Sequence, residues 1–186
     1  MADYDRRQVL GLLGLGALGA VVATSACTPT RRVLVIGDSL TLGAQQQDLG
    51  ARKPWTWTVD ARVGRRTNEG VAVAKQLSIS SFQQVVVALG TNDYLDTKAA
   101  YASRIDAMMA VLPVPRVVWI NVDAGTAKLA PAALGVNPAL KAAPARYRKL
   151  AIGDWDAYLR SRTDPDQYRA ADQVHYNAAG GGPFYA

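Results

Sequence analysis

A serine, a histidine and an aspartate in this sequence are of the types that together carry out acyl transfer. A serine hydroxyl is a weak nucleophile until a base takes its proton, and the usual base is a histidine that titrates near neutral pH. The sequence has 1 histidine, so Ser-His catalysis by Ser39 would need His175 as the general base. Asp172 lies three residues earlier, where its carboxylate can fix the imidazole tautomer and stabilise the imidazolium. We interpret these three residues as a candidate catalytic triad.

Three further groups could stabilise the negative charge that acyl transfer builds on a carbonyl oxygen. Such an oxyanion needs hydrogen-bond donors that are fixed in advance. The candidates are the backbone N–H of Ser39, the backbone N–H of Gly64 and the side-chain amide of Asn92. A glycine also lets the backbone approach a substrate closely. Together they make a candidate oxyanion hole.

Short apolar runs that alternate with helical patterns define the elements that must position these groups. The run at 33–36 is continuous and apolar, as in buried parallel strands, and similar runs occur at 55–59, 85–89, 117–122 and 150–153. Between them, residues 97–112 carry apolar side chains at three-to-four spacing, which predicts a helix. Residues 124–145 are rich in Ala, Pro and Gly, and we expect a long connection there with one short helix. This alternation predicts a three-layer α/β domain with a mainly parallel, five-stranded sheet.

The candidate residues follow these predicted strands, where ligands bind in such sheets. In open α/β sheets the binding crevice lies outside the carboxyl ends of the strands. Ser39, Gly64 and Asn92 follow the first, second and third predicted strands, and Asp172 and His175 come after the last one. We therefore expect all five to meet at one edge of the sheet.

Four short blocks resemble those of the SGNH (GDSL) hydrolase family. In chain order they are Gly37-Asp38-Ser39-Leu40, Gly64, Gly90-Thr91-Asn92-Asp93 and Asp172-Gln173-Val174-His175. The resemblance implies a flavodoxin-like three-layer fold and esterase activity without a cofactor. It also implies a nucleophilic Ser39, a triad completed by Asp172 and His175, and an oxyanion hole made by Ser39, Gly64 and Asn92.

Each of these residues also has an ordinary structural interpretation. Ser39, Asn92 and Asp93 could cap helices, and Gly64 could be a turn glycine. His175 alone would be read as a satisfied surface or core histidine. We interpret Asp38 and Asp93 as structural. Because no cluster of His, Cys or Glu accompanies Asp154 and Asp156, we expect no metal site.

The first 27 residues have the build of a bacterial export signal. Arg6 and Arg7 precede an uncharged apolar stretch at 11–23, which resembles a twin-arginine signal and is too short for a standard membrane span. Ser25-Ala26-Cys27 resembles a lipobox, which would tether the protein to a membrane through a lipidated Cys27; alternatively, Cys27 follows an ordinary cleavage site. We expect an export signal at 1–27, a linker at 28–32 and one hydrolase domain at 33–186, located in the cell envelope or secreted.

The formal net charge of +6 does not predict a nucleic-acid partner, because the arginines are scattered and no reader motif accompanies them. The oligomeric state stays open.

At the carboxyl end, Gly180-Gly181-Gly182-Pro183 would break a helix, so we expect the domain to lack the family's usual final helix.

Three functions fit this set of residues. The first is an exported serine esterase or deacylase that acts on small acyl esters, including acylated carbohydrate. The second is an O-acetyltransferase acting on cell-wall glycan, because Trp119-Ile120-Asn121-Val122, Val136-Asn137 and Ile152-Gly153-Asp154-Trp155 resemble SGNH domains with that activity. The third is a non-catalytic cell-wall-binding module. The triad itself does not distinguish hydrolysis from transfer.

Overall fold

The computed structural model describes residues 31–45 and 55–184 of the chain. The predicted export signal, Cys27 and linker residues 28–30 lie outside the described residues. The strands are β1 (Arg31–Gly37), β2 (Trp55–Ala61), β3 (Gln84–Ala88), β4 (Arg116–Ile120) and β5 (Leu150–Gly153). The α-helices are α1 (Ser39–Gln45), α2 (Thr67–Gln76), α3 (Lys98–Val111), α4 (Ala130–Ala142), α5 (Trp155–Arg160) and α6 (Ala178–Phe184). Short 3-10 turns are η2 (Ile79–Ser81), η3 (Ala143–Ala145) and η4 (Pro165–Tyr168).

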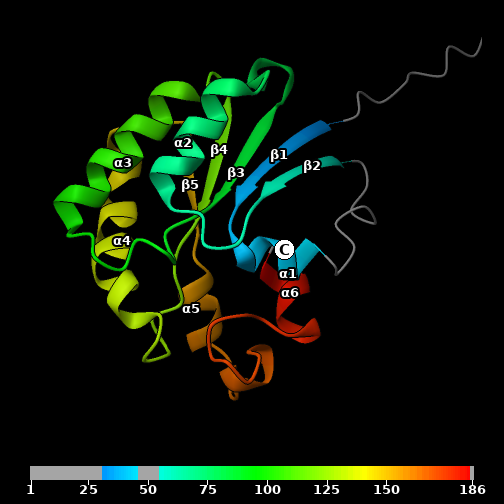
Figure 1. The fold of residues 1–186 in the computed structure, drawn as a ribbon, viewed down its shortest axis with the longest axis vertical. Helices are drawn as coiled ribbons and strands as arrows, with labels where there is room; N and C mark the ends of the chain where they lie inside the picture. Colours follow the sequence, from blue (N-terminus) through cyan, green and yellow to red (C-terminus); the bar gives the residue numbers. More distant parts are fainter. Residues whose placement is uncertain (1–30, 46–54, 185–186) are drawn as a thin grey trace, which may run out of the picture.

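The five strands form one sheet in which every neighbouring pair is parallel. Their order is β2-β1-β3-β4-β5, so the chain leaves β1 in one direction for β2 and then returns past it to β3. This is the flavodoxin-like order, whose switch point lies between β1 and β3. The predicted three-layer α/β architecture and its five strands are confirmed, with helices on both faces of the sheet (Figure 1).

Alternating strand residues divide the core into two layers. Leu34 and Ile36 of β1 join the layer under α2, α3 and α4, whereas Val33 and Val35 join the layer under α1, α5 and α6. All four side chains are at most 1% exposed, because a central parallel strand is covered on both faces. Figure 1 shows α1 and α6 side by side on the second face. This packing places the start of α1 next to the carboxyl-terminal part of the chain.

Three boundaries differ from the sequence prediction. The first strand begins at Arg31 rather than at Val33, so Arg31 and Arg32 belong to β1 and not to the linker. They extend the strand because they pair with Trp55 and Thr56 of β2. Their guanidinium groups also lie over the rings of Trp55 and Phe82. The predicted short helix in the connection 124–145 is the 13-residue α4, one face of which, including Val136 and Leu140, is buried in the core despite Pro138 within the helix.

The third difference is a helix at the carboxyl end, where a break was expected. Helix α6 runs through the glycines of 180–182, because tertiary packing outweighs their low helix propensity. A Cβ atom on Gly180 would lie 2.2 Å from the carbonyl oxygen of Tyr168, so this close approach requires a glycine. Phe184 at the end of α6 packs against Trp155 and Tyr176. These contacts place α6 against α5, next to the loop that carries His175.

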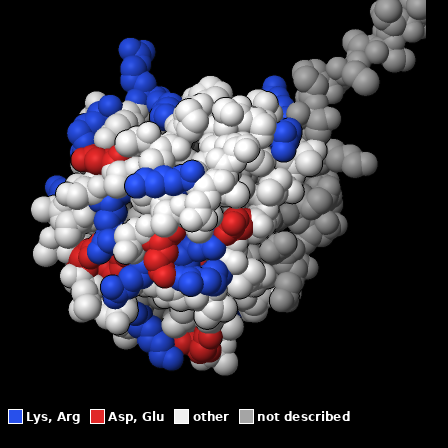
Figure 2. All heavy atoms as spheres, turned by 45° about the horizontal axis from the view of Figure 1, so that its top comes forward, with Lys and Arg blue, Asp and Glu red and all other residues white. Residues whose placement is uncertain are grey.

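The charged side chains are dispersed over the face drawn in Figure 2, with Asp and Glu interspersed among Lys and Arg. In the part of the chain that the structure describes, no helix is long and apolar enough to cross a bilayer.

Candidate active site

Ser39 is the first residue of α1 and lies immediately beyond the end of β1. The strand turns so sharply into the helix that a Cβ atom on Gly37 would lie 1.8 Å from the Thr41 hydroxyl oxygen. The turn therefore requires a glycine at this position. Asp38 closes the turn, since its Oδ1 accepts a hydrogen bond from the Leu40 N–H at 2.9 Å. Ser39 itself is half-buried, whereas Asp38 is fully buried. This strand–turn–helix places the Ser39 side chain at the carboxyl edge of the sheet.

Gly64 lies in the loop between β2 and α2, in a left-handed backbone conformation with φ of 70°. Hydrogen bonds tie this loop to the end of β1. The Arg62 N–H and the Arg65 guanidinium both donate to the carbonyl of Gly37, at 3.3 and 3.2 Å. Arg65 also pairs with Asp60 at 2.6 Å, and its side chain is 7% exposed. Arg65 therefore fixes the glycine loop next to Ser39.

Asn92 follows β3 in a turn that begins at Gly90, where φ is 135° and the Asp93 N–H donates to the Gly90 carbonyl. The side-chain Nδ2 of Asn92 donates to Asp38 Oδ2 and to the Arg65 carbonyl, each at 3.2 Å. The Asn92 carbonyl in turn accepts from Arg66 Nε at 3.1 Å. Direct hydrogen bonds thus join Asn92 to the residue before Ser39 and to the residue after Gly64.

The electrostatics of this cluster centre on Asp38. Burial raises the pKa of Asp38 to about 7, against a lowering by the Leu40 N–H bond and by the charge of His175. Burial also raises the pKa of Asp93, whose Oδ2 accepts from the backbone and hydroxyl of Thr67. The influence of His175 on the pKa of Asp38 shows that the histidine lies near the serine turn.

Asp172 and His175 form a hydrogen-bonded pair, as predicted from their spacing. Asp172 Oδ2 lies 2.6 Å from His175 Nδ1, and Asp172 Oδ1 accepts the backbone N–H groups of Val174 and His175. The hydrogen bonds from the His175 ring and from these backbone groups hold the pKa of Asp172 well below its usual range. Between them, Gln173 takes a left-handed φ of 58°, which closes the turn. The carboxylate is therefore ionised and orients the ring.

The structure brings the five candidate residues together in two units. One unit contains Ser39, Gly64 and Asn92 at the ends of β1, β2 and β3; the other is the Asp172–His175 pair. Within residues 31–45 and 55–184, no hydrogen bond joins Ser39 to His175. Such bonds are often long in the absence of substrate and tighten in its complex. The catalytic roles of these five residues stay predictions.

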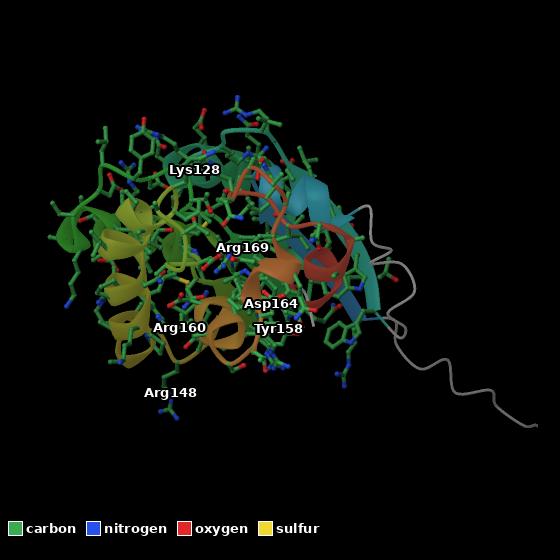
Figure 3. The ribbon with its side chains drawn as sticks, turned by 90° about the horizontal axis from the view of Figure 1, so that it is seen from below. Lys128, Arg148, Tyr158, Arg160, Asp164 and Arg169 are labelled. Carbon is green, nitrogen blue, oxygen red and sulfur yellow. The ribbon has the colours of Figure 1, made fainter. Side chains whose placement is uncertain are left out.

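Sequence reasoning missed the residues that hold the two units in place. The sequence predicts a structural role for Asp38 but does not reveal its hydrogen bond with Asn92. Arg169 is buried and forms a bidentate pair with Asp123, at 2.8 and 3.0 Å, which connects the loop after β4 to the segment carrying His175. In Figure 3 Arg169 lies in the interior, whereas Arg148 points away from the protein. Their partners lie up to 54 residues away in the chain, so no local pattern could have revealed them.

A separate cavity of about 760 Å³ lies between α4 and the β5–α5 connection. Asn121, Asn137 and Asp154 line it, and none of the five candidate catalytic residues does. No group of three or more metal-ligating side chains comes together anywhere in the described parts of the chain.

Solved structures share this architecture at low sequence identity. The C-terminal catalytic domain of peptidoglycan O-acetyltransferase A from Streptococcus pneumoniae matches with a TM-score of 0.65 and 20% identity, over 83% of this chain and 88% of that one. A lipase/acylhydrolase from Enterococcus faecalis matches with a TM-score of 0.66 and 19% identity, over 83% and 93% of the two chains. A member of the lipolytic G-D-S-L family from Veillonella parvula matches with a TM-score of 0.65 and 17% identity, over 83% and 93%. The chain has the SGNH (GDSL) hydrolase fold.

No family model and no curated protein sequence matches the chain. The resemblance to the SGNH fold that four short blocks predicted is nevertheless confirmed by structure. The similarity includes both an O-acetyltransferase domain and acylhydrolases.

Proposed function

We propose that this chain is an exported serine esterase or deacylase that removes small acyl groups from esters, including acylated carbohydrate. The observation that carries the proposal is the hydrogen bond from Asn92 Nδ2 to Asp38 Oδ2 at the β1/β3 switch point. It holds the side chain that we propose as an oxyanion donor against the residue before Ser39, the proposed nucleophile. The oriented Asp172–His175 pair supplies the matching base. Lipases and acylhydrolases among the solved structures of this fold support the same chemistry.

In the proposed reaction, Ser39 Oγ attacks the ester carbonyl carbon while its proton passes to His175 Nε2. The carbonyl oxygen becomes an oxyanion that accepts hydrogen bonds from the Ser39 and Gly64 N–H groups and from Asn92. When the intermediate collapses, the carbon–oxygen bond to the alcohol breaks, and the alcohol leaves with the proton from His175. Water then attacks the acyl-serine by the same steps and releases the carboxylic acid.

An O-acetyltransferase acting on cell-wall glycan is the second candidate function. It is favoured by the similarity to the catalytic domain of peptidoglycan O-acetyltransferase A. The two functions share the acyl-enzyme and differ only in whether water or a sugar hydroxyl takes the acyl group. Export through the segment 1–27, with a lipid tether at Cys27, would bring either activity to cell-wall glycan.

The test incubates the purified full chain with 4-nitrophenyl acetate, with and without a glycan oligosaccharide acceptor. We expect nitrophenol release in step with free acetate, and no release by the Ser39→Ala variant. Acetylated acceptor forming faster than free acetate would replace the hydrolase by the transferase. Turnover that persists in Ser39→Ala would refute the serine mechanism. No turnover by the wild type on a panel of esters would favour the cell-wall-binding module.

A further inference from the structure

The Asn92 amide is held by two acceptors in the structure. Its Nδ2 donates to Asp38 Oδ2 and to the carbonyl of Arg65, each at 3.2 Å. Both distances are at the long end of the range for N–H···O bonds. The donor proposed for the oxyanion is therefore engaged before any substrate arrives.

These acceptors decide which end of the amide faces the serine turn. An ionised carboxylate and a backbone carbonyl accept hydrogen bonds and cannot donate them. Turned over, the amide would place its own oxygen against two other oxygens. The Asp38 carboxylate and the Arg65 carbonyl thus select the orientation in which nitrogen, and not oxygen, faces the site.

Asp38 is itself firmly fixed. Its side chain is fully buried, and Oδ1 is held by the Leu40 N–H at 2.9 Å, within the turn that carries Ser39. The titratable groups whose charges act on Asp38, or on which its charge acts, are His175, Asp93, Tyr101 and Tyr176. The carboxylate is therefore a rigid link between the nucleophile turn and the loop after β3.

We propose that Asp38 is a positioning residue for the oxyanion hole, which holds the Asn92 amide nitrogen toward the acyl carbonyl oxygen and so raises turnover through Asn92. This inference rests on the proposed function. It assigns Asp38 no proton transfer and no contact with substrate.

The two acceptors have different roles as the oxyanion forms. A charged acceptor makes a stronger hydrogen bond than a neutral one. The oxyanion therefore replaces the neutral Arg65 carbonyl as acceptor of a hydrogen bond from Nδ2, which keeps its proton, while the bond to the charged Asp38 persists as the anchor. Because the exchange is favourable only when charge has developed, the donor acts in the transition state and not on the bound ester.

The test is a double-mutant cycle of Asp38→Asn and Asn92→Ala, with kcat and KM measured on 4-nitrophenyl acetate. Asn92→Ala is expected to lower kcat by about a hundredfold to a thousandfold, the usual loss for one oxyanion donor. An asparagine at position 38 keeps the shape and no longer selects the amide nitrogen, so kcat should fall by about tenfold to a hundredfold, with KM nearly unchanged. In the Asn92→Ala background the same change should cost less than about threefold.

Asp93→Asn is the matched control, because Asp93 is a buried carboxylate in the Asn92 loop that bonds Thr67 instead of the amide. Its effect is expected to be the same with and without Asn92. If Asp38→Asn lowers kcat by the same factor in both backgrounds, Asp38 does not act through Asn92 and the inference is wrong.

The pH profile of kcat/KM gives a second readout. Because burial raises the pKa of Asp38 to about 7, wild-type kcat/KM should fall more steeply than that of Asp38→Asn as the pH is lowered from 8 to 6. An equal fall in both proteins would overturn the inference. Ser39→Ala separates the two proposals. If this variant has no turnover while the Asp38→Asn and Asn92→Ala effects are additive, only the role of Asp38 fails. If this variant keeps its turnover, the proposed function fails.

Discussion

At the scale of single residues, the orientation of His175 depends on one carboxylate that is exposed to solvent. The side chain of Asp172 is 47% exposed and that of His175 is 40% exposed. The three hydrogen bonds that the Asp172 carboxylate accepts all come from residues 174 and 175, whereas its backbone carbonyl accepts one from Lys128 Nζ at 2.9 Å. The carboxylate and the ring are therefore a local unit within one turn. Solvent screens its charge more than that of a buried triad aspartate.

The substitution Asp172→Asn should therefore change which nitrogen of the His175 ring carries the proton, without moving the rest of the site. Oδ1 of the new amide can still accept the backbone N–H groups, and its nitrogen then faces His175 Nδ1. The proton would be forced onto Nε2, where the ring can no longer accept from Ser39. We expect kcat/KM on 4-nitrophenyl acetate to fall about a hundredfold, less than the roughly 10⁴-fold loss for a buried triad aspartate. Asp164→Asn, on an exposed carboxylate immediately before η4, is the control; a similar loss there would contradict the assignment.

The buried Asp38 carboxylate makes the stability of the fold depend on pH. Because burial raises its pKa to about 7, the native state holds this proton over a pH range in which the unfolded chain has lost it. The contribution of this group to stability is therefore complete below about pH 4 and is lost as the pH rises toward 7, on the order of 4 kcal/mol by linkage.

Asp38→Asn should remove that loss. We expect the difference in the free energy of unfolding, variant minus wild type, to increase between pH 5 and pH 8, measured by urea denaturation at both pH values. A difference that is constant with pH would show that the carboxylate does not titrate near pH 7 in the folded protein.

At the scale of elements, the turn at Gly64 combines a left-handed backbone conformation with open space around the Cα atom. Its φ of 70° is unfavourable for other residues, and a Cβ there would have no heavy atom within 4 Å. Gly64→Ala should therefore act through backbone conformation alone, costing about 1 kcal/mol of stability. Because relaxation of φ turns the N–H away from the oxyanion, we expect kcat/KM to fall about tenfold, below the loss for a deleted donor.

Gly43→Ala is the matched control, since Gly43 lies within α1 and also has open space around it. Alanine is favoured over glycine in a helix, so this variant should gain about 0.5–1 kcal/mol in the free energy of unfolding, with unchanged kcat/KM. Equal losses of activity in both variants would mean that the Gly64 N–H has no special role.

The same elements show what the sequence could and could not reveal. The apolar runs of the strands were recognisable because both faces of a parallel strand are buried, and Ser39, Gly64 and Asn92 were recognisable because each follows such a run. Helix α6 was missed, because the tight packing of Gly180 against the Tyr168 carbonyl is a tertiary contact that helix propensity does not encode. The Arg65–Gly37 bond was missed as well, because it joins the end of β1 to a loop residue 28 positions away in the chain.

At the scale of the whole molecule, one buried ion pair connects the segment that carries His175 to the loop after β4. Arg169 and Asp123 have side chains 6% and 1% exposed, and their bidentate pairing joins the loop after β4 to the segment 169–176. That segment is closed by a bridge between Arg169 and Tyr176 and by the Ala170 N–H bond to the His175 carbonyl at 2.8 Å. The position of His175 relative to the sheet therefore depends on Arg169.

Arg169→Met should break this connection and leave the Asp123 carboxylate buried without its partner. We expect the free energy of unfolding to fall by about 3–5 kcal/mol, as for other buried pairs that lose one member. We also expect kcat/KM to fall by about tenfold or more at a temperature where the variant is still folded, because small displacements of a base are costly. Urea denaturation and steady-state kinetics on 4-nitrophenyl acetate measure the two effects.

Arg146→Met provides the comparison, because Arg146 pairs with Asp106 on the surface, where their side chains are 43% and 50% exposed. Such pairs contribute about 0–1 kcal/mol, so this variant should keep both its stability and its activity. If Arg169→Met loses stability while kcat/KM stays at the wild-type value, the local bonds of segment 169–176 suffice to position His175. A parallel loss of both quantities, absent in Arg146→Met, means that the loop after β4 holds the catalytic base in place across the carboxyl edge of the sheet.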